Sequence, residues 1–319
     1  MKKQMFPKKS IDKSRNSFVL LRGFDPLPKL SKSEIDSFYT ARPNTGLNLH
    51  VMSFNIRRGT AKDGKNKWTY RRKRVHELFS HYHPDVLGLQ EAMDFQILEI
   101  RTMLPGYKVV GVGNLGGSRG LHTAIFFDAV RFALLAEGTI WFSDTPDVPG
   151  SKGWGNIIPR TCTWTRLIEK NSEQIFYFYN VHLDHLSWRS RKKSAVFLMQ
   201  FIHARHFLKP FVLAGDFNAR EKSVPIQYLK GKIPIMIKTK GTVLNPELLM
   251  DTFRVRNPLK RHISTFHGFC KYFFRFKLDY IFVPTSVGVH DTKIIQEYLG
   301  KYYPSDHFPL LTHIDLPVE

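Results

Sequence analysis

A short apolar run at residues 211–214 leads directly into a Gly-Asp-Phe-Asn segment that contains Asp216 and Asn218. Runs of this length are typical of buried strands, and polar residues that follow such a strand lie at its carboxyl tip. Three more apolar runs end in this way, and a fifth, at 308–311, has its polar residues just before it; these residues are Asn55, Glu91, His182 with Asp184, and Asp306 with His307. Repetition of the pattern across the chain predicts a single site assembled at strand ends.

The composition is that of a globular protein. The chain has 319 residues, 42% of them hydrophobic and 13% aromatic, and no apolar stretch approaches the roughly 18–20 residues that a membrane span needs. The basic start lacks a hydrophobic region of signal-peptide length, so we expect a cytoplasmic protein, with secretion by a signal-less route left open. Cys162 and Cys270 form neither a disulfide framework nor a zinc motif, and we expect both to be reduced.

Periodicity divides the chain into two parts. Residues 1–46 show little periodicity apart from a short helix expected at 32–39, and we interpret them as a basic N-terminal extension that precedes one domain at 47–319. In that domain the patterns predict helices at 71–82, 95–104 and 194–208, and strands at 48–55, 85–90, 107–112, 123–128, 131–136, 162–168, 175–182, 211–216, 277–283 and 308–314. Long strands mixed with helices, without an internal repeat, predict an α/β domain with helices outside packed sheets.

Charge restricts the partners. The formal net charge is +21, and such a field attracts nucleic acid, an anionic membrane surface or another polyanion. Basic residues cluster at 57–74 and again at 189–193, close to proposed site residues, although a solvated basic surface explains the clusters equally well. We expect nucleic acid as the partner, with an anionic membrane as the alternative, and a monomer without a stable protein partner.

The polar residues at the strand ends suit a hard cation. Carboxylate and amide oxygens are preferred by Mg²⁺, with Mn²⁺ as a substitute, whereas a zinc site would need more His or Cys. His182 and His307 add groups that transfer protons or stabilise charge near neutral pH. Because no Cys or Ser stands in a recognisable nucleophile motif, this set favours direct attack of metal-activated water on phosphorus.

Six motifs give the chain a family resemblance. It resembles the endonuclease/exonuclease/phosphatase superfamily, the deoxyribonuclease I-like group, and especially its bacterial members. The matching segments cover nearly all of 47–316 and are residues 53–57 (Ser-Phe-Asn-Ile-Arg), 90–92 (Gln-Glu-Ala), 181–185 (Val-His-Leu-Asp-His), 215–219 (Gly-Asp-Phe-Asn-Ala), 278–282 (Leu-Asp-Tyr-Ile-Phe) and 305–309 (Ser-Asp-His-Phe-Pro).

The resemblance implies a fold and a division of roles. It implies a four-layer α/β sandwich in which two packed mixed β-sheets are flanked by helices. It also implies Mg²⁺ ligands among Asn55, Glu91, Asp216, Asn218 and Asp306, and catalytic roles for His182, Asp216, Asn218, Asp279 and His307. In this arrangement Asp279 orients His307 as the base for water, and His182 stabilises the phosphoryl oxygens. We expect Arg160, Asp184 and His267 to contact the substrate.

One position departs from the family pattern. Relatives often carry a Glu before the strand at 123–127, where it hydrogen-bonds the histidine that matches His182, whereas this chain has Leu121 and His122. A carboxylate partner raises the basicity of a histidine and fixes its tautomer. We therefore expect a weaker His182, or support for it from Asp184 or another group.

Several substrates fit these features. A nuclease is the favoured interpretation, and Trp68, Tyr70 and Trp188 are residues that either stack on bases or belong to the core. The alternative is a sphingomyelinase-like phosphodiesterase or a phosphatase acting on lipid headgroups. For such an enzyme the aromatic and basic run at 269–277 would dock on a membrane, although an ordinary strand or hairpin with alternating burial is the favoured interpretation of this run. A non-catalytic basic binding module is a third reading, disfavoured because all the metal ligands are present.

Overall fold

The structure is a computed structural model that describes residues 46–237, 241–270, 276–296 and 303–317. All but the last residue of the predicted N-terminal extension lies outside the described residues, and so does the helix expected at 32–39. Residues 271–275 of the predicted membrane-docking run also lie outside them. In the described part of that run, Lys277 is buried and paired with Asp251, so this cation does not face a membrane as expected.

The first sheet has six strands in the order β13-β14-β1-β2-β4-β3. Its central strands β1 and β2 are parallel, and every other neighbouring pair is antiparallel. The strands are β1 (Leu47–Asn55), β2 (Val86–Ala92), β3 (Tyr107–Val110), β4 (His122–Asp128), β13 (Gly288–Ile294) and β14 (Leu310–Leu316).

The second sheet repeats this plan in the order β11-β12-β8-β7-β6-β5, with β7 and β8 as its parallel central pair. Its strands are β5 (Phe132–Trp141), β6 (Thr161–Glu169), β7 (Ile175–His182), β8 (Phe211–Asp216), β11 (Leu249–Asp251) and β12 (Asp279–Pro284). A separate two-stranded sheet is formed by β9 (Ile235–Ile237) and β10 (Gly241–Val243).

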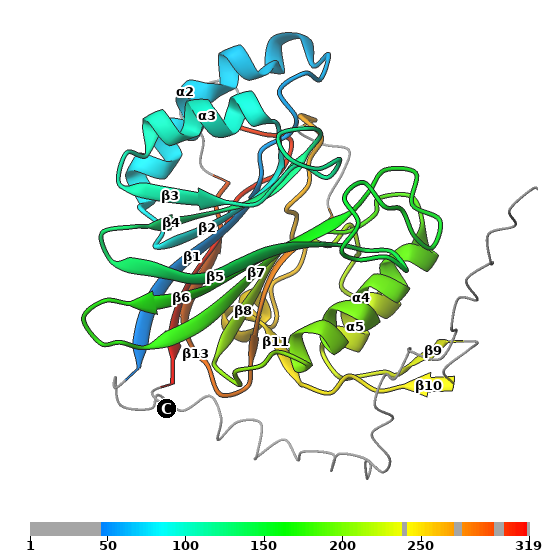
Figure 1. Ribbon diagram of the computed structural model, residues 1–319. Helices are drawn as coiled ribbons and strands as arrows, with labels where there is room; N and C mark the ends of the chain where they lie inside the picture. The colour runs from blue at the N-terminus through cyan, green and yellow to red at the C-terminus, as the bar shows by residue number, and fades with distance from the viewer. Residues whose placement is uncertain (1–45, 238–240, 271–275, 297–302, 318–319) are drawn as a thin grey trace, which may run out of the picture. The chain divides into compact units, whose positions relative to one another are not determined.

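Helices cover the outer faces of both sheets (Figure 1). One core lies between the sheets, a second joins the first sheet to α2 (Trp68–Tyr82) and α3 (Asp94–Met103), and a third joins the second sheet to α4 (Trp188–His203) and α5 (Val224–Leu229). The remaining helical segments are η1 (Gly64–Asn66) and α6 (Thr252–Arg256). Two packed mixed sheets between helical layers confirm the predicted α/β sandwich.

The helix expected at 194–208 is displaced along the chain. It begins at Trp188 because the Ser187 hydroxyl accepts a hydrogen bond from Ser190 N at 3.1 Å and caps the first turn. It ends at His203, so its last predicted turn is not helical. Across the described residues, we find no helix with the length and apolar character needed to cross a bilayer.

Candidate active site

The predicted site residues lie at one edge of the two sheets, because the strands that carry them begin or end there. Asn55 ends β1, Glu91 lies near the end of β2, and His182 and Asp216 end the parallel strands β7 and β8. Asp279 begins β12, which runs antiparallel to β8, so that the register places Asp279 directly opposite Asp216. His182 is the register partner of Asp216 on the other side.

Unusual backbone angles bring these side chains into the site. Gly215 has φ of 145°, and a Cβ at this position would lie 2.1 Å from Val181 O, so only glycine lets β8 approach β7 before Asp216. Glu91 has φ of 61° and lies at an irregularity in the pairing of β2 with β4, which turns its side chain out of the ladder. Asn218, with φ of 47°, donates its backbone N–H to Asp216 Oδ1 at 2.8 Å.

Asp216 is the centre of the acid and histidine cluster. Its Oδ2 lies 3.7 Å from His182 Nε2 and 3.8 Å from His307 Nε2, and it accepts a hydrogen bond from Asn55 Nδ2 at 3.0 Å. The other ring nitrogen of His307, Nδ1, lies 2.9 Å from Asp279 Oδ2. The predicted orientation of His307 by Asp279 is therefore present in the structure, with Nε2 directed towards Asp216.

Burial and mutual charge shift the pKa values of this cluster. Burial and the neighbouring Asp279 carboxylate together raise the pKa of Asp216 to about 7, against the opposing effect of His307. Burial alone would lower the pKa of His307, but Asp279, Asp216 and Asp306 raise it to about 10. His182 behaves differently, since burial and the nearby Arg160 hold its pKa well below the ordinary value.

A second group of oxygen ligands lies beside this cluster. Glu91 Oε1 accepts a hydrogen bond from Asn55 Nδ2 at 3.3 Å, and Glu91 Oε2 accepts one from Arg58 N at the same distance. Burial raises the pKa of Asp306, and the nearby Glu91 carboxylate raises it as well. Two carboxylates that repel each other beside the Asn55 amide fit a hard divalent cation, which would remove the repulsion.

A different cation position is less suitable. One ligand atom each of Asp216, Asp279 and His307 lies within 4.8 Å of the others. One contact within this cluster is already formed, since His307 Nδ1 lies 2.9 Å from Asp279 Oδ2. We therefore favour the side of the site that holds Glu91 and Asp306.

Arg160 replaces a carboxylate as the partner of His182. Its Nη1 lies 2.9 Å from His182 Nε2, and its Nε donates to Asp184 Oδ2 at 3.4 Å. His122, which stands near the position where relatives carry Glu, contacts Ala92 O through Nδ1 at 3.2 Å and not His182. The support expected from Asp184 thus reaches His182 through Arg160, and Arg160 itself is only 4% exposed.

His267 lies behind the site and not in the open part of it. Its backbone N–H donates to Asp306 O at 2.9 Å, and its ring packs against Tyr303 and Phe308 with centroid distances of 4.2 and 4.3 Å. Burial lowers the pKa of His267 to about 3, so the ring is neutral. In this position the backbone of His267 helps to hold the segment that carries Asp306. The expected contact of His267 with substrate remains a prediction.

Three residues that the sequence analysis missed hold the site together. Ser305 Oγ donates to Asn55 O at 2.6 Å, joining the end of β1 to the segment that carries Asp306. Thr265 Oγ1 accepts hydrogen bonds from Leu278 N and Asp279 N at 2.9 and 3.0 Å. Ser305 lies within the 305–309 segment of the resemblance, whereas nothing in the sequence distinguishes the third residue, Arg71, from the other cations of the 57–74 cluster.

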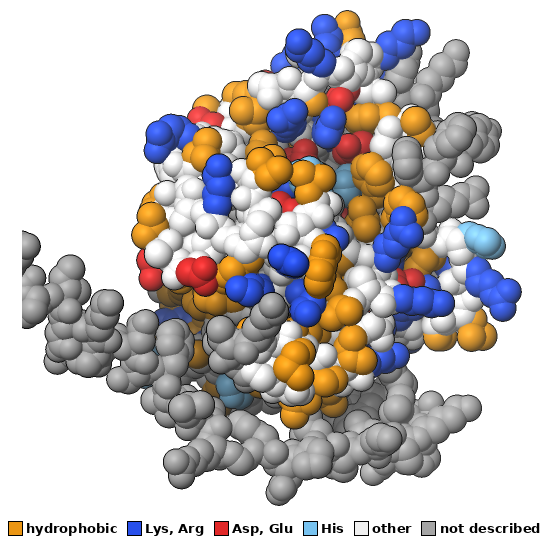
Figure 2. Space-filling model, turned by 90° about the vertical axis from the view of Figure 1, so that its right-hand side faces the viewer, with side chains coloured by type: hydrophobic (Ala, Val, Ile, Leu, Met, Phe, Trp, Pro, Cys, Tyr) orange, Lys and Arg blue, Asp and Glu red, His pale blue; other side chains and the backbone are white. Residues whose placement is uncertain are grey.

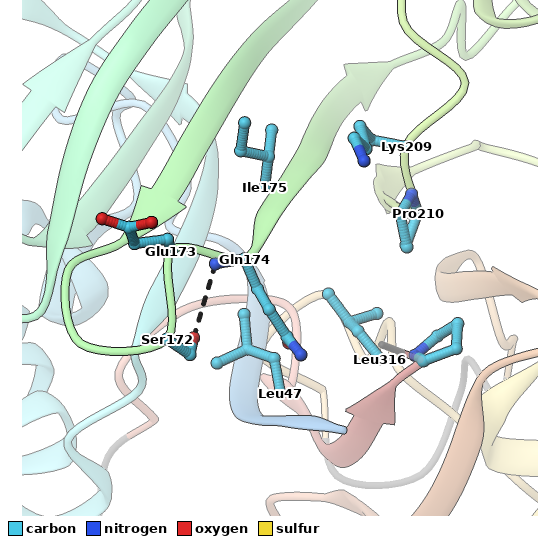
Figure 3. Close-up of a pocket in the computed structure, with 9 residues that line it drawn as sticks. Leu47, Ser172, Glu173, Gln174, Ile175, Lys209, Pro210 and Leu316 are labelled. Carbon is cyan, nitrogen blue, oxygen red and sulfur yellow. Dashed lines mark hydrogen bonds between the residues drawn. The ribbon is translucent and has the colours of Figure 1, made fainter. Parts of the chain in front are cut away.

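A cavity of about 180 Å³ lies at the opposite edge of the sandwich (Figure 3). It is lined by the start of β1, the end of β14 and the segments that precede β7 and β8, including Leu47, Leu316 and Pro210. Among the residues that line it, Glu173 is the one carboxylate. This cavity therefore lacks the ligand set found at the strand ends that carry Asp216.

Basic and aromatic residues surround the edge of the two sheets that carries the candidate site, here called the catalytic edge. Figure 2 shows acidic and histidine side chains gathered in the upper part of one face, with Lys and Arg side chains around them. In the 57–74 cluster Arg71 is buried, Arg57 pairs with Asp63 at 3.1 Å, and the exposed cations are Arg58, Lys62, Lys65, Lys67, Arg72 and Lys73. Trp188 is 59% exposed and Tyr70 is 56% exposed, but Trp68 is 2% exposed, so of the two alternatives for Trp68 the structure favours a core residue over one that stacks on bases.

Comparison with known proteins agrees with this architecture. The model of the Endonuclease/Exonuclease/phosphatase family matches residues 52–307. The chain is 31% identical over 281 residues to an uncharacterised protein of Acanthamoeba polyphaga mimivirus, covering 82% of this chain and 98% of that protein.

Two solved structures are similar throughout. An endonuclease/exonuclease/phosphatase from Bacteroides vulgatus has a TM-score of 0.76 at 27% identity, covering 85% of this chain and 100% of its own. A mannosyl-6-phosphatase from Bacteroides thetaiotaomicron has a TM-score of 0.72 at 29% identity, covering 83% of this chain and 99% of its own. This chain therefore belongs to the endonuclease/exonuclease/phosphatase family of phosphoesterases.

Proposed function

We propose that the protein hydrolyses phosphodiester bonds of nucleic acid by direct attack of water, with Mg²⁺ as its cofactor. The observation that carries this proposal is the position of Asp216 between His182 and His307, beside the oxygen ligands Glu91 and Asp306. Groups that accept and donate protons next to a hard-cation site suit hydrolysis of a phosphate ester.

The cation-binding part of the site would be formed by Glu91, Asn55 and Asp306, with Asp216 and Asn218 at its border. When bound there, Mg²⁺ would polarise a phosphoryl oxygen and stabilise the leaving oxygen. Mn²⁺ has similar ligand preferences and is expected to substitute.

The remaining residues would handle protons and charge. The Asp216 and His307 pair, whose Oδ2 and Nε2 lie 3.8 Å apart, would receive the proton of the attacking water. Asp279 holds His307 in this orientation through Nδ1. His182, kept neutral by burial and by Arg160, would stabilise a phosphoryl oxygen together with the Arg160 guanidinium that contacts it, as negative charge develops there.

The surface around the site favours a polyanionic substrate. The exposed cations of the 57–74 cluster follow the strand that ends in Asn55, and Arg189 and Lys193 are exposed on the helix that follows His182. Trp188 is exposed at the start of this helix, and the cationic groups of Arg189 and Lys192 lie 5.7 and 5.5 Å from the centre of its ring. An exposed aromatic ring flanked by cations suits a base and its neighbouring phosphates.

A phosphomonoester is the second candidate substrate. It is supported by the 29% identity and nearly full coverage shared with the mannosyl-6-phosphatase structure. Because the water-activating residues would act equally on monoesters and diesters, the difference between these substrates depends on the contacts outside the reacting phosphate.

A substrate panel tests the proposal. The full chain is incubated with single-stranded DNA, duplex DNA, RNA, sphingomyelin vesicles and mannose 6-phosphate, each with Mg²⁺ and with excess EDTA at two salt concentrations. We expect Mg²⁺-dependent cleavage of a nucleic acid that decreases with salt, and loss of at least a hundredfold in Asp216→Ala, with the exposed Glu173→Gln as the matched control.

The panel also separates the alternatives. Turnover of mannose 6-phosphate or sphingomyelin without nucleic-acid cleavage would replace the nuclease assignment but keep the phosphoesterase chemistry. Full activity in EDTA would contradict the cation site formed by Glu91 and Asp306.

A further inference from the structure

Three histidines from three adjacent strands lie together on the first sheet, away from the candidate active site. His50 in β1 is the direct register partner of His313 in β14. β13 pairs with β14 on the other side, and a register shift between Val289 and Asp291 leaves His290 beside His313. The ring centroids of His50 and His313 are 4.4 Å apart, and those of His290 and His313 are 4.9 Å apart.

The cluster is separate from the catalytic edge. His50 stands five positions before Asn55 in β1, which corresponds to about 17 Å along a strand. His313 is likewise well inside β14, whose start follows His307. A ligand of the three histidines would therefore not contact the acid and histidine cluster around Asp216.

Neighbouring groups orient two of the rings. His313 Nε2 donates to Asn48 Oδ1 at 2.7 Å, which leaves Nδ1 as the unprotonated nitrogen of a neutral ring. His50 Nδ1 lies 3.8 Å from Asp85 Oδ2, which leaves its Nε2 on the other side of the ring. The contact of His313 with Asn48 is the usual arrangement around histidines that bind metals, in which the second ring nitrogen donates to an oxygen.

The histidines are accessible. The side chain of His50 is 49% exposed, His290 is exposed, and His313 is half-buried between them. The rings of His50 and His313 are nearly parallel, with 12° between their planes, so their nitrogens do not yet face one point. Exposed side chains change rotamer rapidly, and residues directly opposite on antiparallel strands have Cβ atoms only about 5 Å apart.

We propose that His50, His290 and His313 form a binding site for a divalent transition-metal ion such as Zn²⁺. Three neutral imidazoles match the ligand preference of Zn²⁺, and would leave a fourth position for water or for the exposed carboxylate of Asp291. Mg²⁺, which prefers oxygen, would not compete for it. The site is independent of the proposed hydrolysis.

Calorimetric titration with Zn²⁺ in excess Mg²⁺ tests the proposal on the full chain. We expect His313→Ala and His290→Ala each to bind one Zn²⁺ fewer than the wild type, or to bind it at least tenfold more weakly, and Asn48→Ala to weaken it about tenfold. The exposed His206→Ala is the matched control and should bind as the wild type does. Because His290 is exposed, we expect His290→Ala to fold. This variant therefore still tests the proposal if His313→Ala does not fold.

A spectroscopic measurement identifies the ligands. Co²⁺ in place of Zn²⁺ should give the visible absorption of a site with several nitrogen ligands, and this absorption should disappear in His290→Ala. Zn²⁺ stoichiometry and affinity that are the same in the wild type and in all the histidine-cluster variants would overturn the proposal. A fall in Zn²⁺ binding equally large in His206→Ala would also overturn it, as nonspecific binding to surface histidines.

Discussion

Arg71 Nη1 donates to Pro304 O at 2.7 Å and also to Ile56 O at 2.8 Å. One buried guanidinium therefore joins α2 to the segment after β1 and to the segment before β14. Arg71 Nε donates to a third carbonyl, that of Asn66, at 2.6 Å. These segments carry Asn55 and Asp306, so Arg71 acts as a positioning residue for the proposed cation site without contacting the cation.

Substitution of Arg71 by Met is expected to weaken both folding and activity. It leaves buried carbonyls without donors, at about 1–3 kcal/mol for each unsatisfied group, and we expect a loss of about 3 kcal/mol in the free energy of unfolding. In the same variant, the Mg²⁺ concentration at half-maximal activity should rise. The neighbouring Arg72→Met is the control, since Arg72 is 53% exposed and lies 3.7 Å from Glu99. Equal effects of the two substitutions in urea unfolding would contradict this role.

Glu91→Gln tests the cation site directly. Removal of one carboxylate keeps the shape of the side chain but removes its charge, so the Mg²⁺ dependence of the rate should shift to concentrations at least tenfold higher. Stability should rise or stay unchanged in the absence of metal, because Asp306 loses a repulsive neighbour. An unchanged Mg²⁺ dependence would place the cation elsewhere, with the position between Asp216 and Asp279 as the next to test.

The sequence predicts the central strands and the edge strands β3 and β5, but it misses the edge strands β11 and β13. Strands β7 and β8 were predicted with their observed limits, because each is an apolar run that the structure buries between two layers. The edge strand β13 was not predicted, since His290, Asp291 and Lys293 give it a polar pattern and it pairs on one side only.

Some site residues can likewise be predicted from the sequence, and others cannot. Residues at strand tips are visible in a sequence, because an apolar run followed by an acid places that acid at an edge. The contact of Arg160 with His182 depends on the pairing of β6 with β7 and on the segment before β6, and no local pattern encodes it. The burial of Arg71 depends on a carbonyl 233 positions away.

The contact between Asp279 and His307 predicts a dependence of stability on pH. The pKa of His307 in the folded protein is about 10, above the value of about 6.5 expected in the unfolded chain. Its stabilising contribution is therefore complete below pH 6.5 and is lost as the pH rises through 10, by an amount on the order of 5 kcal/mol.

Asp279→Asn should flatten this dependence. In metal-free protein, the free energy of unfolding of the wild type should fall more between pH 7 and pH 10 than that of the variant, while Asp147→Asn, at an exposed position, should follow the wild type. Parallel curves for wild type and Asp279→Asn would show that His307 gains no proton affinity from Asp279.

Trp188→Ala tests the proposed contact with nucleic acid. Stacking on an exposed aromatic ring contributes about 1–3 kcal/mol for each base, so the Kd for single-stranded DNA should rise roughly tenfold. The variant should keep its thermal stability, because 59% of Trp188 is exposed. Binding is measured with Asp216→Ala as background to prevent cleavage. Tyr70→Ala is the comparison at the other basic cluster, and an unchanged Kd in both variants would remove base stacking from the proposal.

Lys277 and Asp251 form a buried ion pair whose contribution to the free energy of unfolding can be tested by substitution. Lys277 Nζ lies 2.8 Å from Asp251 Oδ2, each side chain is 1% exposed, and the ammonium lies 3.4 Å from the centre of the Tyr280 ring. Asp251 also caps α6, by accepting a hydrogen bond from Phe253 N. Lys277→Met leaves this carboxylate buried and unpaired, so we expect a loss of about 3–5 kcal/mol in the free energy of unfolding.

The double substitution Lys277→Met with Asp251→Ser should recover most of that loss. Serine keeps a capping oxygen for α6, and no buried charge remains without a partner. A double variant as unstable as Lys277→Met alone would mean that the ion pair itself stabilises β12 beside β11, and not merely that each charge requires the other. Because Asp279 lies two residues beyond Lys277, activity of the double variant also reports whether this pair holds the start of β12, and with it Asp279, in place for His307.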